Sequence, residues 1–308
     1  MKKFEKYINI IQNDFPTFNI SSINKIGEGD NSKAFVINEN HIFRFPKRKE
    51  VKQQIQREIA VLPKIKSLLN FQIPQFEFIS PDINFVGYKI IPGIPFSLEI
   101  YNSLNKKQQV FIQRTLGNFL FQLHHIDLSI FSNCSLEIMD PSEEYSDNFD
   151  KAQKFIYPHI SKNKQITITQ LFMEYLNNPE NFNYIPALIH NDFSKDHILF
   201  DIVNKPYLPA GRQITGIIDF GDIAIGDPDY DLMYLMDEFG DRFLKEIFKI
   251  YKPKNEKELM KKLYFFTLAN KIQIILEYRN DKDSADFKNA YKELEIWFKR
   301  FDIKKITI

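Results

Sequence analysis

The sequence predicts an α+β protein of two lobes, a small β-rich N-terminal lobe and a larger, mainly helical C-terminal lobe. Three observations support this prediction. Short alternating segments separated by turn residues occupy the first third of the chain, a connector containing Pro92, Gly93 and Pro95 follows, and segments with helical spacing dominate the remainder. We therefore expect an N-terminal lobe over residues 1–92, a hinge at about 88–95, and a C-terminal lobe over residues 93–308.

The N-terminal lobe is expected to contain a small antiparallel sheet and one helix. Its strands share an alternation of apolar and polar residues and are bounded by turn residues. They cover residues 20–26, 34–37, 42–45, 76–79 and 85–91. Helical spacing of apolar residues predicts a helix over 51–69, which Pro63 should kink or shorten because proline has no amide hydrogen to donate.

The C-terminal lobe is expected to consist mainly of helices. These segments share apolar residues at three- and four-residue spacing. They cover residues 105–125, 142–157, 165–177, 228–251, 256–278 and 284–301. Strands are expected only around two acid-bearing segments, near 188–192 and 217–219, and residues 205–212 between them have the Pro/Gly-bearing composition of a long hairpin loop.

Composition limits the classes of function. The net charge of +1 and the absence of a long basic run give no indication of a nucleic-acid partner. The single cysteine, Cys134, excludes an internal disulfide and a multi-cysteine zinc site. The first residues have no apolar core, and no run of about 18 uncharged apolar residues occurs, so no membrane partner is expected. We expect a soluble, cytoplasmic monomer.

Two segments carry the residues with catalytic potential. The first is Leu188-Ile189-His190-Asn191-Asp192-Phe193-Ser194-Lys195-Asp196-His197, and the second is Ile217-Ile218-Asp219-Phe220-Gly221. In each, an apolar run of strand length leads to an aspartate in a polar turn. Phosphoryl transfer needs this combination, because one aspartate must face the attacking hydroxyl while another holds magnesium on a nucleotide.

These segments resemble the signature of the kinase-like antibiotic and choline phosphotransferases. The resemblance is closest to the aminoglycoside 2''-phosphotransferases, with H-N-D-F-S-x-x-H/N followed by I-D-F-G-D, and it spans nearly the full length. Each fragment alone is a weak motif, but their order after two apolar runs is fairly specific. The resemblance implies a protein-kinase-like fold, Mg²⁺ as cofactor, and GTP or ATP as phosphate donor.

The resemblance gives the acid-bearing segments distinct roles. Asp192 should accept or orient the proton of the attacking hydroxyl. Asp219 should bind magnesium; the alternative is a turn aspartate satisfied by local amides. His197 lies where the family usually has a metal-binding asparagine, so it is either a second metal ligand or a structural histidine. His190 is expected to brace the loop.

Nucleotide binding is expected in the N-terminal lobe. Gly27, Gly29 and Ser32 lie in a turn where glycines let backbone amides approach phosphates, although an ordinary β-turn explains the same residues. Glu58 fits the helix partner of a strand cation; the alternative is an exposed helix residue. The strand has Arg44 where the resembling enzymes usually have lysine, and either Arg44 substitutes for it or Lys47 reaches in.

The residues beside the hinge concern the nucleotide base. By resemblance, Tyr88 occupies the gatekeeper position, where a bulky phenol restricts the depth of the pocket. Ile90 and Ile91 would offer backbone groups to the base. Several relatives with a large gatekeeper prefer GTP, so we expect GTP to be preferred over ATP. The alternative is that Tyr88 is an ordinary aromatic residue of the core.

The acceptor is inferred from charge. Residues 219–241 contain eight carboxylates and no Lys, Arg or His. Asp227, Asp229 and Asp231 are explained by a helix start. The remaining candidates share a carboxylate or phenol that could hold a cationic acceptor by resemblance. Together with Asp192 they are Asp222, Asp237, Glu238, Glu277 and Tyr278, with exposed surface charge as the alternative for Asp237 and Glu238.

The function predicted from the sequence is transfer of a nucleotide γ-phosphate to a hydroxyl, the 2''-hydroxyl, of an aminoglycoside antibiotic, which would confer resistance. One alternative enzyme acts on another small hydroxylated molecule, such as choline, a macrolide or a sugar. A second alternative, suggested by Arg44 and His197, is a nucleotide-binding pseudokinase of weak or absent activity.

Overall fold

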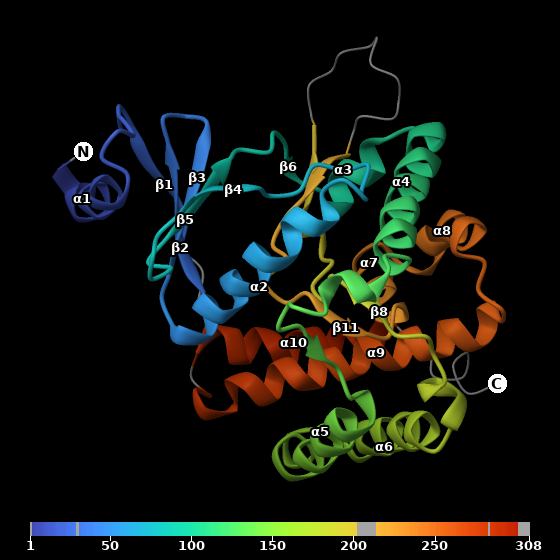
Figure 1. Ribbon diagram of the computed structural model, residues 1–308. Coiled ribbons are helices and arrows are strands. Elements are labelled where there is room, and N and C mark those ends of the chain that lie inside the picture. Colours follow the sequence, from blue (N-terminus) through green and yellow to red (C-terminus); the bar gives the residue numbers. More distant parts are fainter. Residues whose placement is uncertain (1, 29–30, 202–213, 283, 301–308) are drawn as a thin grey trace. The chain divides into compact units, whose positions relative to one another are not determined.

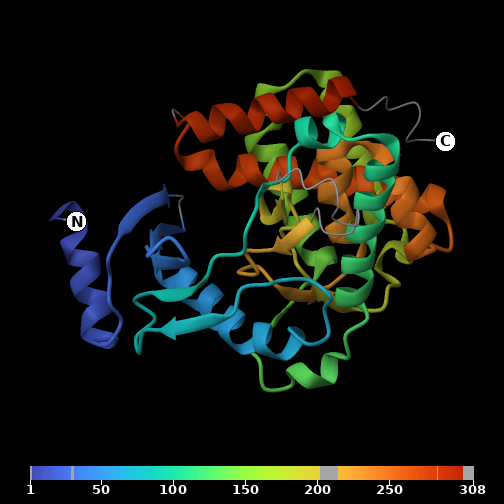
Figure 2. The ribbon, with the colours of Figure 1, turned by 90° about the horizontal axis from the view of Figure 1, so that it is seen from above.

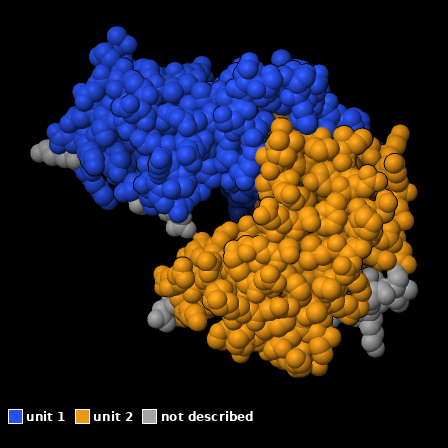
Figure 3. Space-filling model, turned by 60° about the horizontal axis from the view of Figure 1, so that its bottom comes forward, with its two compact units in different colours: residues 1–137, 190–224 blue, residues 138–189, 225–308 orange. Residues whose placement is uncertain are grey.

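The computed structural model describes residues 2–28, 31–201, 214–282 and 284–300 (Figure 1). The chain divides into two compact units, and each unit is built from two separated stretches of sequence (Figure 3). Unit 1 contains residues 1–137 and 190–224, and unit 2 contains residues 138–189 and 225–308. The lobe boundary expected near residue 92 marks a change from β-rich to helical sequence, and it stays a prediction.

A five-stranded antiparallel sheet forms the first part of unit 1. Its strand order is β1-β2-β3-β5-β4. The strands are β1 (Ile23–Glu28), β2 (Ser32–Ile37), β3 (His41–Pro46), β4 (Phe76–Ile79) and β5 (Val86–Lys89). The predicted antiparallel sheet is thus present, with ends that differ from the predicted ones by up to three residues. The predicted α+β class is confirmed, because mainly helical chain follows this sheet.

Alternation along β3 directs its side chains to opposite faces of the sheet. Phe43 and Phe45 are buried with Ile8 and Ile11 of α1 (Glu5–Asp14), a short helix that the sequence analysis did not predict. Arg44 points to the other face, where Val86 packs against α2. One strand therefore contributes both to an aromatic core and to a polar site.

The helix α2 (Lys49–Ile65) covers the second face of this sheet. Val51 and Ile55 are buried against Val86, and Glu58 lies one turn further along. Pro63 lies inside the last turn, and the helix ends at Ile65 instead of the predicted residue 69. This early end agrees with the expected effect of a proline near a helix terminus.

Unit 1 also contains a helical part and a second small sheet. Its further helices are α3 (Leu98–Ser103) and α4 (Lys106–His124), and its further strands are β6 (Ile94–Pro95), β9 (Ile198–Phe200) and β10 (Ile214–Ile217), paired in the order β10-β9-β6. Asn105 and Gln108 form a reciprocal capping box at the start of α4. The loop predicted over 205–212 lies outside the described residues.

Unit 2 is mainly helical. Its helices are α5 (Pro141–Phe155), α6 (Lys162–Leu176), α7 (Asp229–Phe239), α8 (Leu244–Tyr251), α9 (Glu256–Glu277) and α10 (Ala285–Arg300). The strands β8 (Ala187–Ile189) and β11 (Ala224–Gly226) form a small sheet with β7 (Glu137–Ile138). Figure 2 shows α9 and α10 side by side, and the Trp297 indole donates to the Thr267 hydroxyl at 2.8 Å between them.

The single helix predicted over 228–251 is wrong. The chain breaks at Gly240, whose φ of +88° ends α7, and resumes in α8 after a short 3₁₀ turn. A positive φ is readily adopted by glycine, which explains why apolar spacing on both sides did not give one continuous helix. Among the described residues, no helix has the length and apolar content needed to cross a membrane.

A buried lysine joins the start of α7 to α9. Lys262 lies 2.5 Å from Asp227 and 2.8 Å from Asp229, measured from Nζ to the carboxylate oxygens. Burial raises the pKa of Asp227 to about 6, although Lys262 opposes this effect. The Asp227 carboxylate also accepts the Asp229 amide, so the predicted helix-start role is present. Lys262 compensates both carboxylates.

Replacing Lys262 with methionine should lower the free energy of unfolding by about 3–5 kcal/mol, because two carboxylates then stay without their buried cation. Urea unfolding at pH 7.5 measures the change. Lys261→Met is the matched control: Lys261 precedes Lys262 on α9 and pairs with Glu258 in a more exposed setting, so its loss should stay below about 1 kcal/mol. Similar losses in both variants would contradict this interpretation.

Candidate active site

The first acid-bearing segment leaves the buried strand β8 through a sharp turn. Asn191 has a φ of +66°, in the left-handed region that asparagine tolerates better than most residues. Phe193 is fully buried and stacks on Phe119 of α4, with ring centroids 5.2 Å apart. The main chain is therefore held on both sides of Asp192, whose side chain keeps 36% of its surface exposed. A partly exposed carboxylate on a fixed turn can meet a substrate hydroxyl.

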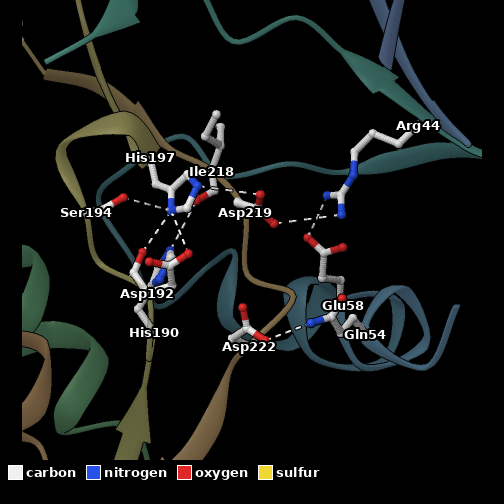
Figure 4. A network of polar contacts seen from close by, with 10 residues as sticks. All are labelled: Arg44, Gln54, Glu58, His190, Asp192, Ser194, His197, Ile218, Asp219 and Asp222. Atoms are coloured by element: carbon white, nitrogen blue, oxygen red, sulfur yellow. Dashed lines mark hydrogen bonds and ion pairs between the residues drawn. The ribbon is translucent and has the colours of Figure 1, made fainter. Parts of the chain in front are cut away.

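His197 connects the two acid-bearing segments (Figure 4). Its Nδ1 lies 2.8 Å from the Asp192 main-chain carbonyl, which can only accept, so Nδ1 carries the hydrogen. The same Nδ1 lies 3.5 Å from Asp192 Oδ2, and Nε2 lies 3.6 Å from Asp219 Oδ2. One imidazole therefore lies between the two aspartates that the sequence singled out.

Asp219 follows β10 in a strained turn. Its φ of +63° is rare for a residue with a side chain and costs about 1–3 kcal/mol, which sites of function commonly sustain. Burial by itself would raise the pKa of Asp219, but the positive charge of Arg44 and the field of His197 outweigh it and lower the pKa. Asp219 is thus held as a carboxylate, the form that binds a cation.

A second histidine, His190, also connects the two acid-bearing segments. His190 is fully buried, and its Nε2 donates to the main-chain carbonyl of Ile218 at 3.1 Å. The Ile218 amide donates to the His197 carbonyl at 3.0 Å. The ring of His190 also lies 4.6 Å from that of Phe220. These contacts agree with the bracing role expected for His190 and fix the residues that precede Asp219.

The cation on β3 reaches two carboxylates at once. Arg44 Nη1 lies 3.1 Å from Glu58 Oε1, and its Nη2 lies 3.8 Å from Asp219 Oδ1 (Figure 4). Burial alone would lower the pKa of Arg44, but Glu58 and Asp219 raise it, so the guanidinium stays charged. Burial raises the pKa of Glu58 against the effect of Arg44. Lys47 is exposed beyond the strand end, which favours Arg44 as the predicted phosphate-binding cation.

Glu58 is not the exposed helix residue of the alternative interpretation, because none of its surface is accessible. The same face of α2 carries a residue that the sequence analysis missed. Gln54, one helical turn before Glu58, donates from Nε2 to Asp222 Oδ1 at 2.8 Å. Burial raises the pKa of Asp222, and Gln54 opposes it. The sequence signal that could have identified Gln54 is its spacing of four residues from Glu58, which places both on one face of α2.

The predicted nucleotide residues occupy the sheet and its edge. Ser32 begins β2, and its hydroxyl is buried without a hydrogen-bond partner among the described atoms. Gly27 lies at an irregularity of β1, with open space where a side chain would stand. Gly29 lies outside the described residues. These positions leave the phosphate-binding role of the turn a prediction.

The hinge residues lie at the end of β5 and directly after it. Tyr88 is buried, and its ring contacts that of Phe76 edge-on at 5.7 Å. Burial raises its pKa to about 12, so the phenol stays neutral. The Ile90 amide already donates to the Asn40 carbonyl at 2.9 Å, so it is committed within the protein. Ile91 packs closely on β10, where a side chain at Gly216 would come within 2.6 Å of it.

The donor set near Asp219 suits a magnesium ion bound together with phosphates. The Asp219 carboxylate and the Nε2 of His197 face each other, and in the neutral imidazole, whose hydrogen is on Nδ1, Nε2 has a lone pair that can bind a cation. Within residues 2–28, 31–201, 214–282 and 284–300, no group of three metal-binding side chains occurs. Magnesium prefers oxygen ligands and commonly uses one or two carboxylates plus phosphate oxygens and water, so Asp219 fits that mode, whereas an imidazole nitrogen is a less usual ligand and the role of His197 as second ligand stays a prediction.

Unit 2 contains the other candidate acceptor residues. Asp237 is paired with Lys271 of α9, with 2.6 Å between Oδ2 and Nζ, and Glu238 follows it on α7. Glu277 ends α9 and accepts a long hydrogen bond from Gln273 at 3.5 Å, and Tyr278 begins the next 3₁₀ turn. The acidic segment therefore has cationic partners from outside residues 219–241, which charge counting along the chain did not anticipate.

The antiparallel sheet carries Arg44, which pairs with Glu58, and two aspartates follow short strands further along the mainly helical chain. This combination is typical of phosphotransferases with the protein-kinase-like fold. Comparison with known families agrees. Residues 22–263 match the model of the phosphotransferase enzyme family, and the chain belongs to that family.

Solved structures narrow the resemblance. The GDP and kanamycin complex of APH(2'')-IIIa is 26% identical, covers 96% of this chain and 99% of its own, and has a TM-score of 0.89. The streptomycin–ATP complex of APH(2'')-IIa is 24% identical, with coverages of 99% and 98% and a TM-score of 0.74. A macrolide 2'-phosphotransferase type I is 15% identical, with coverages of 96% and 97% and a TM-score of 0.74. The predicted resemblance to the aminoglycoside 2''-phosphotransferases is confirmed, while the last two structures support the fold alone.

Arg44→Met should lower the free energy of unfolding by about 3 kcal/mol, because Glu58 is then buried without its cation. Arg44→Lys should cost less, since an ammonium still pairs with Glu58, although it cannot span both carboxylates as the guanidinium does. Urea unfolding of the two variants and the parent measures the difference. Equal losses would mean that the charge of Arg44 does not stabilise Glu58.

Proposed function

We propose that this protein transfers the γ-phosphate of GTP, or less efficiently ATP, to the 2''-hydroxyl of an aminoglycoside. The observation that carries the proposal is the meeting of Asp192 and Asp219 at the two nitrogens of His197, beside the Arg44–Glu58 pair. The similarity to a GDP and kanamycin complex over 96% of the chain supports both the donor and the acceptor class.

Asp192 is the proposed proton acceptor. Phosphoryl transfer requires an oxygen nucleophile held in line more than it requires a strong base. The carboxylate would orient the acceptor hydroxyl and take its proton as the bond to phosphorus forms. His197 Nδ1 binds the main-chain carbonyl of the same residue, so the imidazole fixes the turn that presents the carboxylate.

The nucleotide is proposed to bind between the residues of β2, β3 and α2 and the Asp219 turn. Arg44 would contact phosphate oxygens, with Glu58 fixing its guanidinium. Ser32 at the start of β2 and the backbone near Gly27 and Gly29 would contact other phosphate oxygens. Asp219 and His197 would hold Mg²⁺, which, when bound, neutralises charge on the phosphates.

The acceptor is proposed to be polycationic. Its ammonium and hydroxyl groups would contact Asp222, Asp237, Glu238, Glu277 and Tyr278, because carboxylates attract and orient a polycation. Adding a phosphate would place negative charge on a drug that depends on positive charge. Resistance to the antibiotic would follow from that change.

Asp192→Asn should lower kcat by at least about a hundredfold, in line with typical contributions of a positioned proton acceptor. Purified protein is incubated with Mg²⁺, GTP or ATP, and kanamycin, gentamicin, choline, a macrolide or a simple sugar, and phosphate incorporation is followed. The structure of the product identifies the hydroxyl. Transfer only to choline, the macrolide or the sugar would replace the proposed acceptor, and nucleotide binding without any turnover would indicate a pseudokinase.

The donor preference gives a separate prediction. The parent protein should have a higher kcat/KM with GTP than with ATP, and Tyr88→Ala should shift the ratio toward ATP by about tenfold, because removal of the ring deepens the pocket. Tyr88→Phe is the matched control, since it keeps the ring and should keep the preference. A parent enzyme that uses ATP as well as GTP would contradict the gatekeeper role of Tyr88.

A further inference from the structure

Lys271 forms an ion pair with Asp237, one of the proposed acceptor-binding carboxylates. Lys271 comes from α9, and its Nζ lies 2.6 Å from Oδ2 of Asp237 near the end of α7. The two side chains keep only 13% and 21% of their surface exposed. This ion pair is therefore withdrawn from solvent far more than an ordinary surface pair, and screening by water weakens it less.

The end of α7 that carries Asp237 is anchored independently of this lysine. Arg300 of α10 donates to the main-chain carbonyls of Asp237 and Met236, the latter at 3.1 Å. The Met236 carbonyl also accepts the Gly240 amide at 2.9 Å, and both carbonyls belong to the last turn of the helix, where a cation is favourable. Gly240 then ends the helix. Asp237 is thus held in place by its backbone, while the long stem of Lys271 is the adjustable member of the pair.

The chemistry of the pair resembles that of the proposed substrate contact. A lysine side chain ends in a primary ammonium group, and an aminoglycoside presents primary ammonium groups to carboxylates. The Lys271 ammonium therefore satisfies Asp237 in the same way that a substrate ammonium would. A substrate group can bind Asp237 only if Lys271 moves away or shares the carboxylate, and either change weakens the substrate contact.

We propose that Lys271 is a specificity-determining residue of the acceptor site, because its ammonium competes with an acceptor ammonium for Asp237. This inference rests on the proposed aminoglycoside phosphotransferase activity. Because of this competition, Asp237 contributes less to the affinity for the acceptor than a carboxylate without a lysine partner would. Acceptors with several further ammonium groups recover the loss through their other contacts, whereas acceptors with few such groups bind weakly.

The test is Lys271→Met, which keeps the length and apolar stem of the side chain and removes its charge. With Mg²⁺ and GTP at saturation, the KM for kanamycin should fall by about tenfold, the effect expected for one released ammonium–carboxylate contact in a partly buried site. Lys271→Arg keeps the charge and should keep the parent KM. Lys261→Met is the matched control on the same helix, because Lys261 pairs with Glu258 instead, and its KM should equal that of the parent.

A double variant and a binding measurement complete the test. In Asp237→Asn/Lys271→Met the gain should disappear, because the carboxylate for which the two ammonium groups compete is gone. Calorimetric titration with kanamycin in the absence of nucleotide should follow the same order of affinities. Thermal unfolding of each variant separates a loss of folding from a change in binding, since a purely structural lysine would lower Tm without lowering KM.

The outcomes are distinct. If the parent phosphorylates kanamycin and Lys271→Met leaves KM unchanged or raises it, the competition by Lys271 is refuted while the proposed activity stands. If neither the parent nor any variant transfers phosphate to an aminoglycoside or binds one, the proposed function fails and the role of Lys271 fails with it. A fall in KM confined to Lys271→Met and lost in the double variant supports the inference.

Discussion

The arrangement of the site depends on the contacts that the His197 imidazole makes with both aspartates. Its Nδ1 binds the Asp192 backbone, and its Nε2 faces the Asp219 carboxylate. Burial lowers the tendency of His197 to carry a proton, but Asp192 and Asp219 outweigh that effect and raise its pKa. Two carboxylates that come from separate turns are thereby kept at one place, and Arg44 balances their charge from the sheet.

Residues whose roles follow from local pattern could be predicted from the sequence. The alternation around Phe43 and Phe45 indicated a strand, and two apolar runs placed Asp192 and Asp219 in turns. The irregular features were harder to predict. The helix α1 spans only ten residues, so its apolar pattern covers less than three turns, and Gly240 interrupts a pattern that is continuous on either side of it. In both cases, tertiary packing or a single positive φ decided the outcome.

Partners from distant parts of the chain could not be predicted from the sequence. Nothing near Asp237 indicates Lys271, because the two residues meet only when α7 packs on α9. The same is true of Gln54 with Asp222 and of Lys262 with Asp227. Counting charges along residues 219–241 indicated an uncompensated acidic segment, whereas the folded protein supplies cations from helices further along the chain. Charge complementarity is a property of the fold and not of one segment.

The interleaved composition of the two units has a consequence for biosynthesis. Translation delivers residues 1–137 first, yet the unit to which they belong also requires residues 190–224, and the intervening stretch belongs to the other unit. No stretch shorter than residues 1–224 therefore contains all of unit 1. Vectorial folding on the ribosome, which serves proteins with consecutive domains, is limited here. The five-stranded aromatic sheet lies within residues 23–89, so all of its strands emerge early, whereas the small sheet of β6, β9 and β10 must wait for residues 198–217.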